Sequence, residues 1–220
     1  MIKIEKLKLE VSNLGHITNT YIIYDEDKNA VIIDPADESF KIIDVIKKYD
    51  LNVKYVFITH VHADHISALN DVVSYTGAKV LCHEKDYDKF SDVKASCADI
   101  LDATLQDVSN MDVYQIKEQE YSIKVGNMDF FIINTPGHTS GSIVIYEKNT
   151  DVLFSGDTIF SNSYGRCDLI SGSFDDIKKS VKKIEETFDS NTKIFPGHGE
   201  DSNIENAMKR IKLLIAIKRG

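Results

Sequence analysis

Short runs of β-branched residues alternate with helical periodicity in the first third of the chain. Apolar and charged residues alternate over the first ten positions, MIKIEKLKLE, and this period of two predicts a strand. The same argument predicts strands at Tyr21 to Tyr24, Ala30 to Ile33, Lys54 to Ile58 and Val80 to Cys82, with a turn over Asp25 to Asn29.

Two helices are predicted between these strands. Ser39 is predicted to cap the first, which would bury a stripe of Phe40, Ile43, Ile46 and Tyr49 with Ile42 beside it. The second runs from Ile66 to about Thr76, and Gly77 ends it. The segment from about Ser91 to Asn110 is polar and aperiodic, so it predicts no regular element.

From Met111 onward the pattern changes to a sheet-rich half. Strands are predicted at Met111 to Lys117, Tyr121 to Val125, Met128 to Asn134, Ser142 to Tyr146, Asp151 to Phe154 and Lys193 to Phe195. A helix from Ser173 and another over about Asn203 to Lys218 carry apolar stripes. Strands with flanking helices in both halves predict an α/β fold of two sheets packed face to face, with helices outside. With no flexible linker and no internal repeat, residues 1–220 are predicted to form one domain.

Composition excludes several classes of protein. A chain of 220 residues with 42% hydrophobic residues can bury a core, so disorder is excluded. The formal charge of −9 argues against nucleic-acid binding, which needs clustered positive charge. Apolar runs such as Leu213 to Ile217 are too short to cross a membrane, and no signal peptide is evident, so a cytoplasmic protein is expected. The 3 cysteines are odd in number and widely spaced, which favours reduced thiols.

The histidines are concentrated after predicted strands. Three fall in the run Thr59-His60-Val61-His62-Ala63-Asp64-His65. Side chains two apart in an extended segment point the same way, so His60 and His62 can reach one metal while Asp64 and His65 diverge toward a neighbouring point.

Three further strand ends carry polar residues of the same kind. They are Pro136-Gly137-His138, Ser155-Gly156-Asp157 and Pro196-Gly197-His198. Proline fixes its own backbone and glycine permits an unusual one, so each Pro-Gly pair would aim the following histidine from a rigid corner. Singly, each polar residue has a structural explanation, such as a helix cap at Asp64 or a turn at Asp157. Together they predict a metal site, because clustering them without a cation would be costly.

These segments resemble those of the metallo-β-lactamase superfamily. The matching motifs are H-x-H-x-D-H over His60 to His65, TPGHT over Thr135 to Thr139, SGD over Ser155 to Asp157, and PGH over Pro196 to His198. The resemblance implies an αββα sandwich of two mixed sheets with helices on the outer faces and a binuclear metal site at their edge. By the same resemblance, one metal would be held by His60, His62 and His138, the other by Asp64, His65 and His198, and Asp157 would bridge them.

The resemblance also implies an activity. The stretch from Phe154 to Asp168 is similar to glyoxalase II-like hydrolases and persulfide dioxygenases. β-Lactamases do not usually carry a carboxylate in the bridging place, so antibiotic hydrolysis is not expected. Only about 22 residues follow His198, room for a single helix, which is typical of a short single-domain glyoxalase II-like subgroup without the helical domain that grips glutathione. The implied reaction is hydrolysis of a small thioester by a metal-bridging hydroxide, with Asp64 and Asp157 as catalytic residues.

The metal identity and the substrate contacts are less specific. Histidine and carboxylate ligands favour zinc, with iron or manganese as alternatives. Tyr164 and His16 are candidate substrate contacts. Arg166 could bind a substrate carboxylate or pair with Asp168. Asp34 is expected to steady the histidine loop and not to bind metal.

Two alternative functions stay open. A mononuclear iron persulfide dioxygenase would use His60, His138 and Asp157 as a facial triad. A metal-stabilised binding or sensor module would hold the ions without turnover. The complete second ligand set favours hydrolysis over both.

Overall fold

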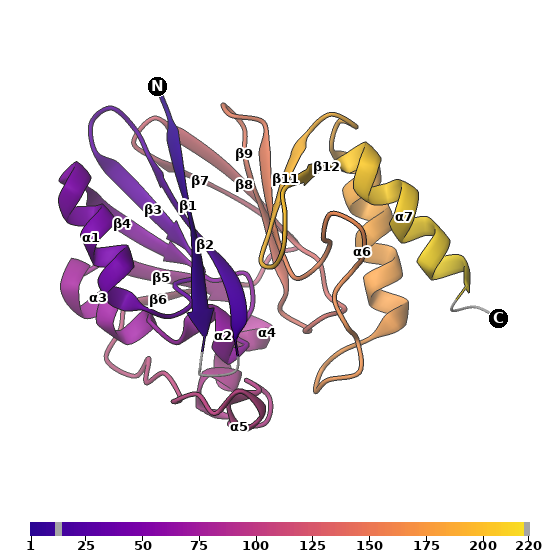
Figure 1. The fold of residues 1–220 in the computed structure, drawn as a ribbon, viewed down its shortest axis with the longest axis horizontal. Coiled ribbons are helices and arrows are strands. Elements are labelled where there is room, and N and C mark those ends of the chain that lie inside the picture. Colours follow the sequence, from indigo (N-terminus) through magenta and orange to yellow (C-terminus); the bar gives the residue numbers. More distant parts are fainter. Residues whose placement is uncertain (12–14, 218–220) are drawn as a thin grey trace.

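Two sheets form the centre of the computed structural model, which describes residues 1–11 and 15–217 (Figure 1). The first sheet has the order β1-β2-β3-β4-β5-β6. Its strands are β1 (Lys3–Val11), β2 (His16–Tyr24), β3 (Asn29–Ile33), β4 (Asn52–Phe57), β5 (Lys79–His83) and β6 (Val113–Ile116). Strands β1, β2 and β3 pair antiparallel, and the strands from β3 to β6 pair parallel, so the sheet is mixed.

The second sheet has the order β12-β11-β10-β9-β8-β7. Its strands are β7 (Glu120–Val125), β8 (Met128–Asn134), β9 (Ile143–Glu147), β10 (Val152–Gly156), β11 (Lys193–Pro196) and β12 (Ser202–Asn203). Only β10 and β11 pair parallel, so this sheet is mixed as well.

Helices cover the outer faces of both sheets (Figure 1). Helices α1 (Ser39–Tyr49) and α3 (Leu69–Thr76) lie on the first sheet, and α6 (Phe174–Thr187) and α7 (Ile204–Ile217) lie on the second. Shorter turns of helix are α2 (Ala63–Ile66), α4 (Glu84–Tyr87), η1 (Asp88–Ser91) and α5 (Ala98–Leu101). The predicted αββα sandwich is confirmed.

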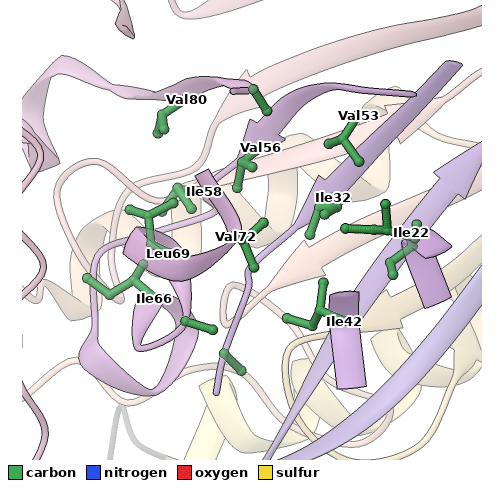
Figure 2. Close-up of a cluster of buried hydrophobic side chains, with 14 of the residues drawn as sticks. Ile22, Ile32, Ile42, Val53, Val56, Ile58, Ile66, Leu69, Val72 and Val80 are labelled. Carbon is green, nitrogen blue, oxygen red and sulfur yellow. The ribbon is translucent and has the colours of Figure 1, made fainter. Parts of the chain in front are cut away.

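Alternation along the central strands supplies three apolar layers. In β2, Ile22 points into the cluster beneath α1 and α3, whereas its neighbours Tyr21 and Ile23 point toward the second sheet. Figure 2 shows the first of these clusters, where Ile42 and Leu69 from the helices lie close to strand residues. Strands that are buried on both faces hold their edge rigidly, which matters for the side chains that follow them.

The predicted cap of α1 is wrong, and its predicted stripe is correct for Ile42, Ile46 and Tyr49 but wrong for Phe40. Ser39 is the first helical residue, and Glu38 occupies the N-cap position, while the Ser39 hydroxyl donates to Asp71 at 2.7 Å. Phe40 is 60% exposed. The predicted row repeats every three residues and therefore drifts around a helix of 3.6 residues per turn. The row that contacts the core is Ile42, Val45, Ile46 and Tyr49.

The predicted helix from Ile66 to Thr76 is two helices. The Ala68 amide donates to the carbonyls of Pro35 and Ala36, at 3.0 and 3.2 Å, and not to a carbonyl of its own helix. This tertiary contact ends α2 and lets α3 begin at Leu69, which sequence periodicity could not indicate. Gly77 ends α3 in the left-handed conformation, as predicted. Helix α6 begins at Phe174, and Ser173, the predicted first residue, is its N-cap, with the side chain accepting the Asp176 amide.

Two further boundaries differ from the sequence-based expectation. Strand β2 begins at His16, five positions before the predicted start at Tyr21, and the segment left without an element contains α5. Lys218, the predicted end of the last helix, lies outside the described residues. Among residues 1–11 and 15–217, no helix is long and apolar enough to cross a membrane.

The placement of Phe130 in the core and of Phe40 at the surface leads to a stability prediction. Phe130 is fully buried between the sheets, with its ring edge-on to Phe57. Phe130→Ala should lower the free energy of unfolding by about 3–5 kcal/mol, because it leaves a cavity. Phe40→Ala should change it by less than about 0.5 kcal/mol, as is usual for surface positions. Urea unfolding measures both, and similar losses in the two variants would contradict the assigned layers.

Candidate metal centre

Strands from both sheets place polar residues at one shared edge. β3, β4, β8, β10 and β11 end there, and β2 begins there. The sheets are joined at this edge by hydrogen bonds from the Asn19 amide to the Gly197 carbonyl, at 2.7 Å, and from the Ile143 amide to the Thr59 carbonyl, at 2.9 Å. The seven residues brought together are His60, His62, Asp64, His65, His138, Asp157 and His198.

The first group of ligand atoms belongs to His60, His62 and His138. Potential ligand atoms of these three side chains lie within 4.8 Å of one another, and their ring centroids are 4.6–4.7 Å apart. The Nε2 atoms of all three are buried and lack a hydrogen-bond partner among the described residues. Buried polar atoms are normally satisfied, so three such atoms facing one point fit a site for a cation.

The second group consists of Asp64, His65 and His198. The Nε2 atom of His198 lies 3.2 Å from Oδ2 of Asp64 and 3.3 Å from Nε2 of His65. Asp157 lies between the two groups: its Oδ2 is 3.4 Å from Nε2 of His198 and 3.6 Å from Nε2 of His138, and its Oδ1 is 3.4 Å from Nε2 of His65. This is the position that a bridging carboxylate requires.

Hydrogen bonds on the far side of four rings fix which nitrogen faces the centre. In each ring Nδ1 lies beside an acceptor, so in the neutral form that binds a metal Nδ1 carries the proton and the Nε2 lone pair points inward. The acceptors are Thr59 Oγ1 for His60 (3.1 Å), Asp34 Oδ2 for His65 (2.8 Å), the Arg166 carbonyl for His138 (2.8 Å) and the Ile17 carbonyl for His198 (2.8 Å).

Electrostatics divide the imidazoles into two kinds. Burial lowers the pKa of His62 to about 3 and holds the pKa of His60 well below its ordinary value. Burial is the largest single influence on His65 and His198 as well, but the charges of Asp157 and Asp64 and the hydrogen bonds to carboxylates together outweigh it and raise their pKa values to about 10 and about 11. For Asp157, burial opposes ionisation, yet His198 and His65 keep its pKa well below the ordinary value. Metal binding at the second group would therefore release protons.

The donor set fits two divalent metal ions. Neutral imidazoles and ionised carboxylates are the forms that bind zinc, iron or manganese. The inward Nε2 atoms and the unpaired Oδ1 of Asp157 are the atoms that such ions would satisfy. The structure brings together the seven residues that the family resemblance assigns to the two metals, with Asp157 between the two groups.

Asp34 holds the histidine loop through three contacts. Its Oδ1 accepts the Thr59 amide at 2.7 Å, and its Oδ2 accepts the Thr59 hydroxyl at 2.6 Å and the His65 ring at 2.8 Å. Because these donors occupy both carboxylate oxygens, the contacts support the expected positioning role.

Asp86 is a second buried carboxylate that sequence analysis missed. Its Oδ2 accepts the Thr139 hydroxyl at 2.7 Å and the Val61 amide at 3.4 Å. Its Oδ1 accepts the Gly141 amide at 2.8 Å and pairs with Lys89. Val61 lies between two ligands of the first group, and Thr139 follows the third. Asp86 therefore ties together the two loops that supply this group. The one available sequence indication was its place just after β5, at the same edge.

The two Pro-Gly corners work in different ways. Gly137 has φ +141, the unusual backbone that the motif predicts. Gly197 is not among the glycines with positive φ, so that expectation is wrong for the second corner. A side chain at Gly197 would instead collide with the Asp157 carboxylate and the His65 ring. At Gly197 the absence of a side chain lets the backbone approach Asp157 and His65 closely, and an unusual backbone conformation is not required.

A cavity of about 330 Å³ opens onto the ligand atoms. His16 and Arg166 line it, and the His16 ring stacks on His198 with centroids 5.6 Å apart. The Arg166 guanidinium makes two hydrogen bonds of 2.8 Å to Asp168. Tyr164 is not in the lining, because its ring packs against Phe174 beside the cluster under α6.

The rest of the lining contains residues that sequence analysis did not select. They are Cys97, Ile100, Leu101, Phe160 and Leu169. Three of them lie in the aperiodic segment, where no pattern pointed to a site.

Comparisons with known proteins give relatives over nearly the whole chain. A model of the metallo-beta-lactamase superfamily matches residues 14–198. Hydroxyacylglutathione hydrolase GloC of Haemophilus influenzae is 30% identical over 84% of this chain and 87% of its own. The structure of BLEG-1 B3 metallo-beta-lactamase superposes with a TM-score of 0.85 at 30% identity, covering 97% of this chain and 99% of that one. ETHE1 from Myxococcus xanthus gives 0.74 at 27% identity, covering 97% and 85%.

The Asp86 contacts lead to a prediction about metal affinity. Asp86→Asn should weaken binding at the first group about 10- to 100-fold, the usual cost of losing a group that orients ligands. Asp25→Asn is the matched control: Asp25 is equally buried, but it accepts amides of Asn29 and Asn127 beyond the other end of β2. Chelator competition on metal-loaded proteins gives both affinities, and equal affinities in the two variants would contradict the role of Asp86.

Proposed function

Since the chain belongs to the metallo-beta-lactamase superfamily and is a metal-dependent hydrolase, we propose that it cleaves small thioesters at a pair of metal ions. The position of Asp157 carries this proposal. Its two oxygens face both groups of ligands, at 3.4 Å from His65 and His198 and 3.6 Å from His138. The similarity to a hydroxyacylglutathione hydrolase supports a thioester as the substrate.

The chemistry follows from what a loaded centre and the surrounding residues would each do. Bound divalent ions would lower the pKa of a shared water and polarise a substrate carbonyl. Asp157 and Asp64 offer ionised carboxylates to that centre. The rings of His65 and His138 are held in place by hydrogen bonds at their Nδ1 atoms. The cavity places a carbonyl next to these atoms and restricts water on its apolar side.

A thioester suits this arrangement for a simple reason. Its leaving group is a thiol with an ordinary pKa of about 8.5, so it departs as a thiolate with little need for a proton donor. Amide cleavage would need a proton donor placed at the leaving nitrogen.

A second candidate function is persulfide oxidation at a single iron. The similarity to ETHE1 favours it, and His60, His138 and Asp157 supply the two imidazoles and one carboxylate of such a site. The presence of Asp64, His65 and His198 as a second group favours the hydrolase. A binding or sensor module without turnover is the third candidate, and the cavity that reaches the ligand atoms argues against it.

One set of assays on anaerobically purified protein separates these functions. We expect two metal ions per chain and thioester hydrolysis that needs no oxygen. One iron per chain with persulfide-dependent oxygen uptake would establish the second candidate. A β-lactam belongs in the panel because of the similarity to BLEG-1, and its hydrolysis in preference to thioesters would contradict the proposal.

Removing the bridging carboxylate gives the sharpest variant. Asp157→Ala should lower thioester hydrolysis at least about 100-fold, since it removes a group that faces both metal positions. The core should remain folded, because the side chain contacts ligands and not the apolar layers. Circular dichroism checks the fold beside the kinetic assay. Wild-type activity in a folded variant would show that the assignment is wrong.

A further inference from the structure

The lining of the cavity over the centre combines two chemically different sets of residues. One set consists of metal-ligand candidates, among them His62, Asp64, His138 and Asp157. The other consists of Ile100, Leu101 and Leu169, which we call the apolar wall. A substrate whose reacting carbonyl reaches the ligand atoms must place some other part of itself against this wall.

The apolar wall rests on a small core of its own. Leu101 is 7% exposed and packs with Ala63, Cys97 and Ala98, and Leu169 packs against the same cluster. Ala63 lies in the run that supplies His62 and Asp64, so the wall is fixed relative to the centre. Because it is anchored in this way, the wall is a preformed surface.

Ile100 is the exposed part of this wall. It belongs to α5, between the buried residues Ala98 and Leu101, and yet 61% of it is exposed. A large apolar side chain that is held in the open beside reactive groups gains free energy when a ligand covers it.

Charge around the wall does not suit an anionic acyl group. Arg166 is the one Lys or Arg in the described lining, and its Nε and Nη2 atoms already donate to Asp168 at 2.8 Å. An acyl carboxylate would have to share Arg166 with the Asp168 carboxylate, and it would lie near Asp64 and Asp157.

We infer that the apolar wall binds the acyl group of the substrate, and that this acyl group is an uncharged hydrocarbon chain. The inference rests on the proposed thioester hydrolysis and deepens it by naming the substrate class. The wall and the metal-ligand atoms line one cavity, so a substrate bound at the ligand atoms also contacts the wall. The thiol carrier would then point toward the cavity mouth.

A series of acyl thioesters on one thiol, N-acetylcysteamine, tests the inference. We expect kcat/KM to rise about fourfold for each added CH₂ from acetyl to hexanoyl, as burial of about 0.8 kcal/mol per CH₂ implies. Succinyl and butyryl thioesters have chains of equal length, and the uncharged butyryl ester should be preferred. Equal rates along the series, or a preference for succinyl, would overturn the inference while leaving thioester hydrolysis in place.

Variants locate the effect on the wall. Ile100→Ser should flatten the dependence on chain length, whereas Ile170→Ser should preserve it. Ile170 is a matched control because it is 50% exposed and follows Leu169, but it does not line the cavity. If Ile100→Ser changes the oligomeric state and leaves the chain-length dependence intact, the wall is a contact between copies of this chain and the inference is wrong.

Binding measurements separate failure of the inference from failure of the proposed function. Non-hydrolysable S-alkyl thioethers of N-acetylcysteamine should bind with dissociation constants that fall as the alkyl chain lengthens, by calorimetry on the metal-loaded protein. Chain-length-dependent binding without hydrolysis of any thioester would sink the proposed function and keep the wall. Binding that ignores chain length would sink the inference whatever the enzyme hydrolyses.

Discussion

Cation binding is the constraint on which the rest of this structure depends. Five imidazoles and two carboxylates lie together at one edge of two sheets, and His65, with no exposed surface, lies 3.4 Å from Asp157. Burying so many polar groups is unfavourable unless each finds a partner. Metal ions would supply that partner for the inward Nε2 atoms of the first group. The surrounding hydrogen bonds, from Asp34 to the carbonyls of Arg166 and Ile17, then act to orient ligands that the ions require.

The fold serves this constraint by making the edge rigid from both sides. Strands buried on both faces end at the centre, and side chains that follow them have little freedom. Asn19 shows how the sheets are joined there. Its side-chain Nδ2 donates to the carbonyls of Pro196, at 2.9 Å, and Gly199, at 3.0 Å, on either side of His198. Asp86 joins the two loops of the first group in a similar way, by accepting hydrogen bonds from Val61 and Thr139. Apolar packing between the layers and hydrogen bonds between the loops together hold the candidate ligands in position.

The sequence indicated the candidate metal ligands more clearly than the residues that position them. His60, His138 and Asp157 stand in short motifs after regular strands. The αββα sandwich is confirmed, and the structure brings these three residues together. Asp86 escaped notice because its partners, Val61 and Thr139, are distant in sequence and only folding brings them within reach. The wall residue Ile100 escaped because a four-residue helix has no periodicity to detect. The break at Ala68 was unpredictable for the same reason as Asp86, since a tertiary hydrogen bond decides it.

The most direct test of the metal centre is anomalous diffraction from crystals of the metal-loaded protein, recorded at the absorption edge of the bound element. We expect two peaks per chain, one among the Nε2 atoms of His60, His62 and His138 and one among Asp64, His65 and His198, with Asp157 contacting both. A single peak, or peaks away from these side chains, would contradict it.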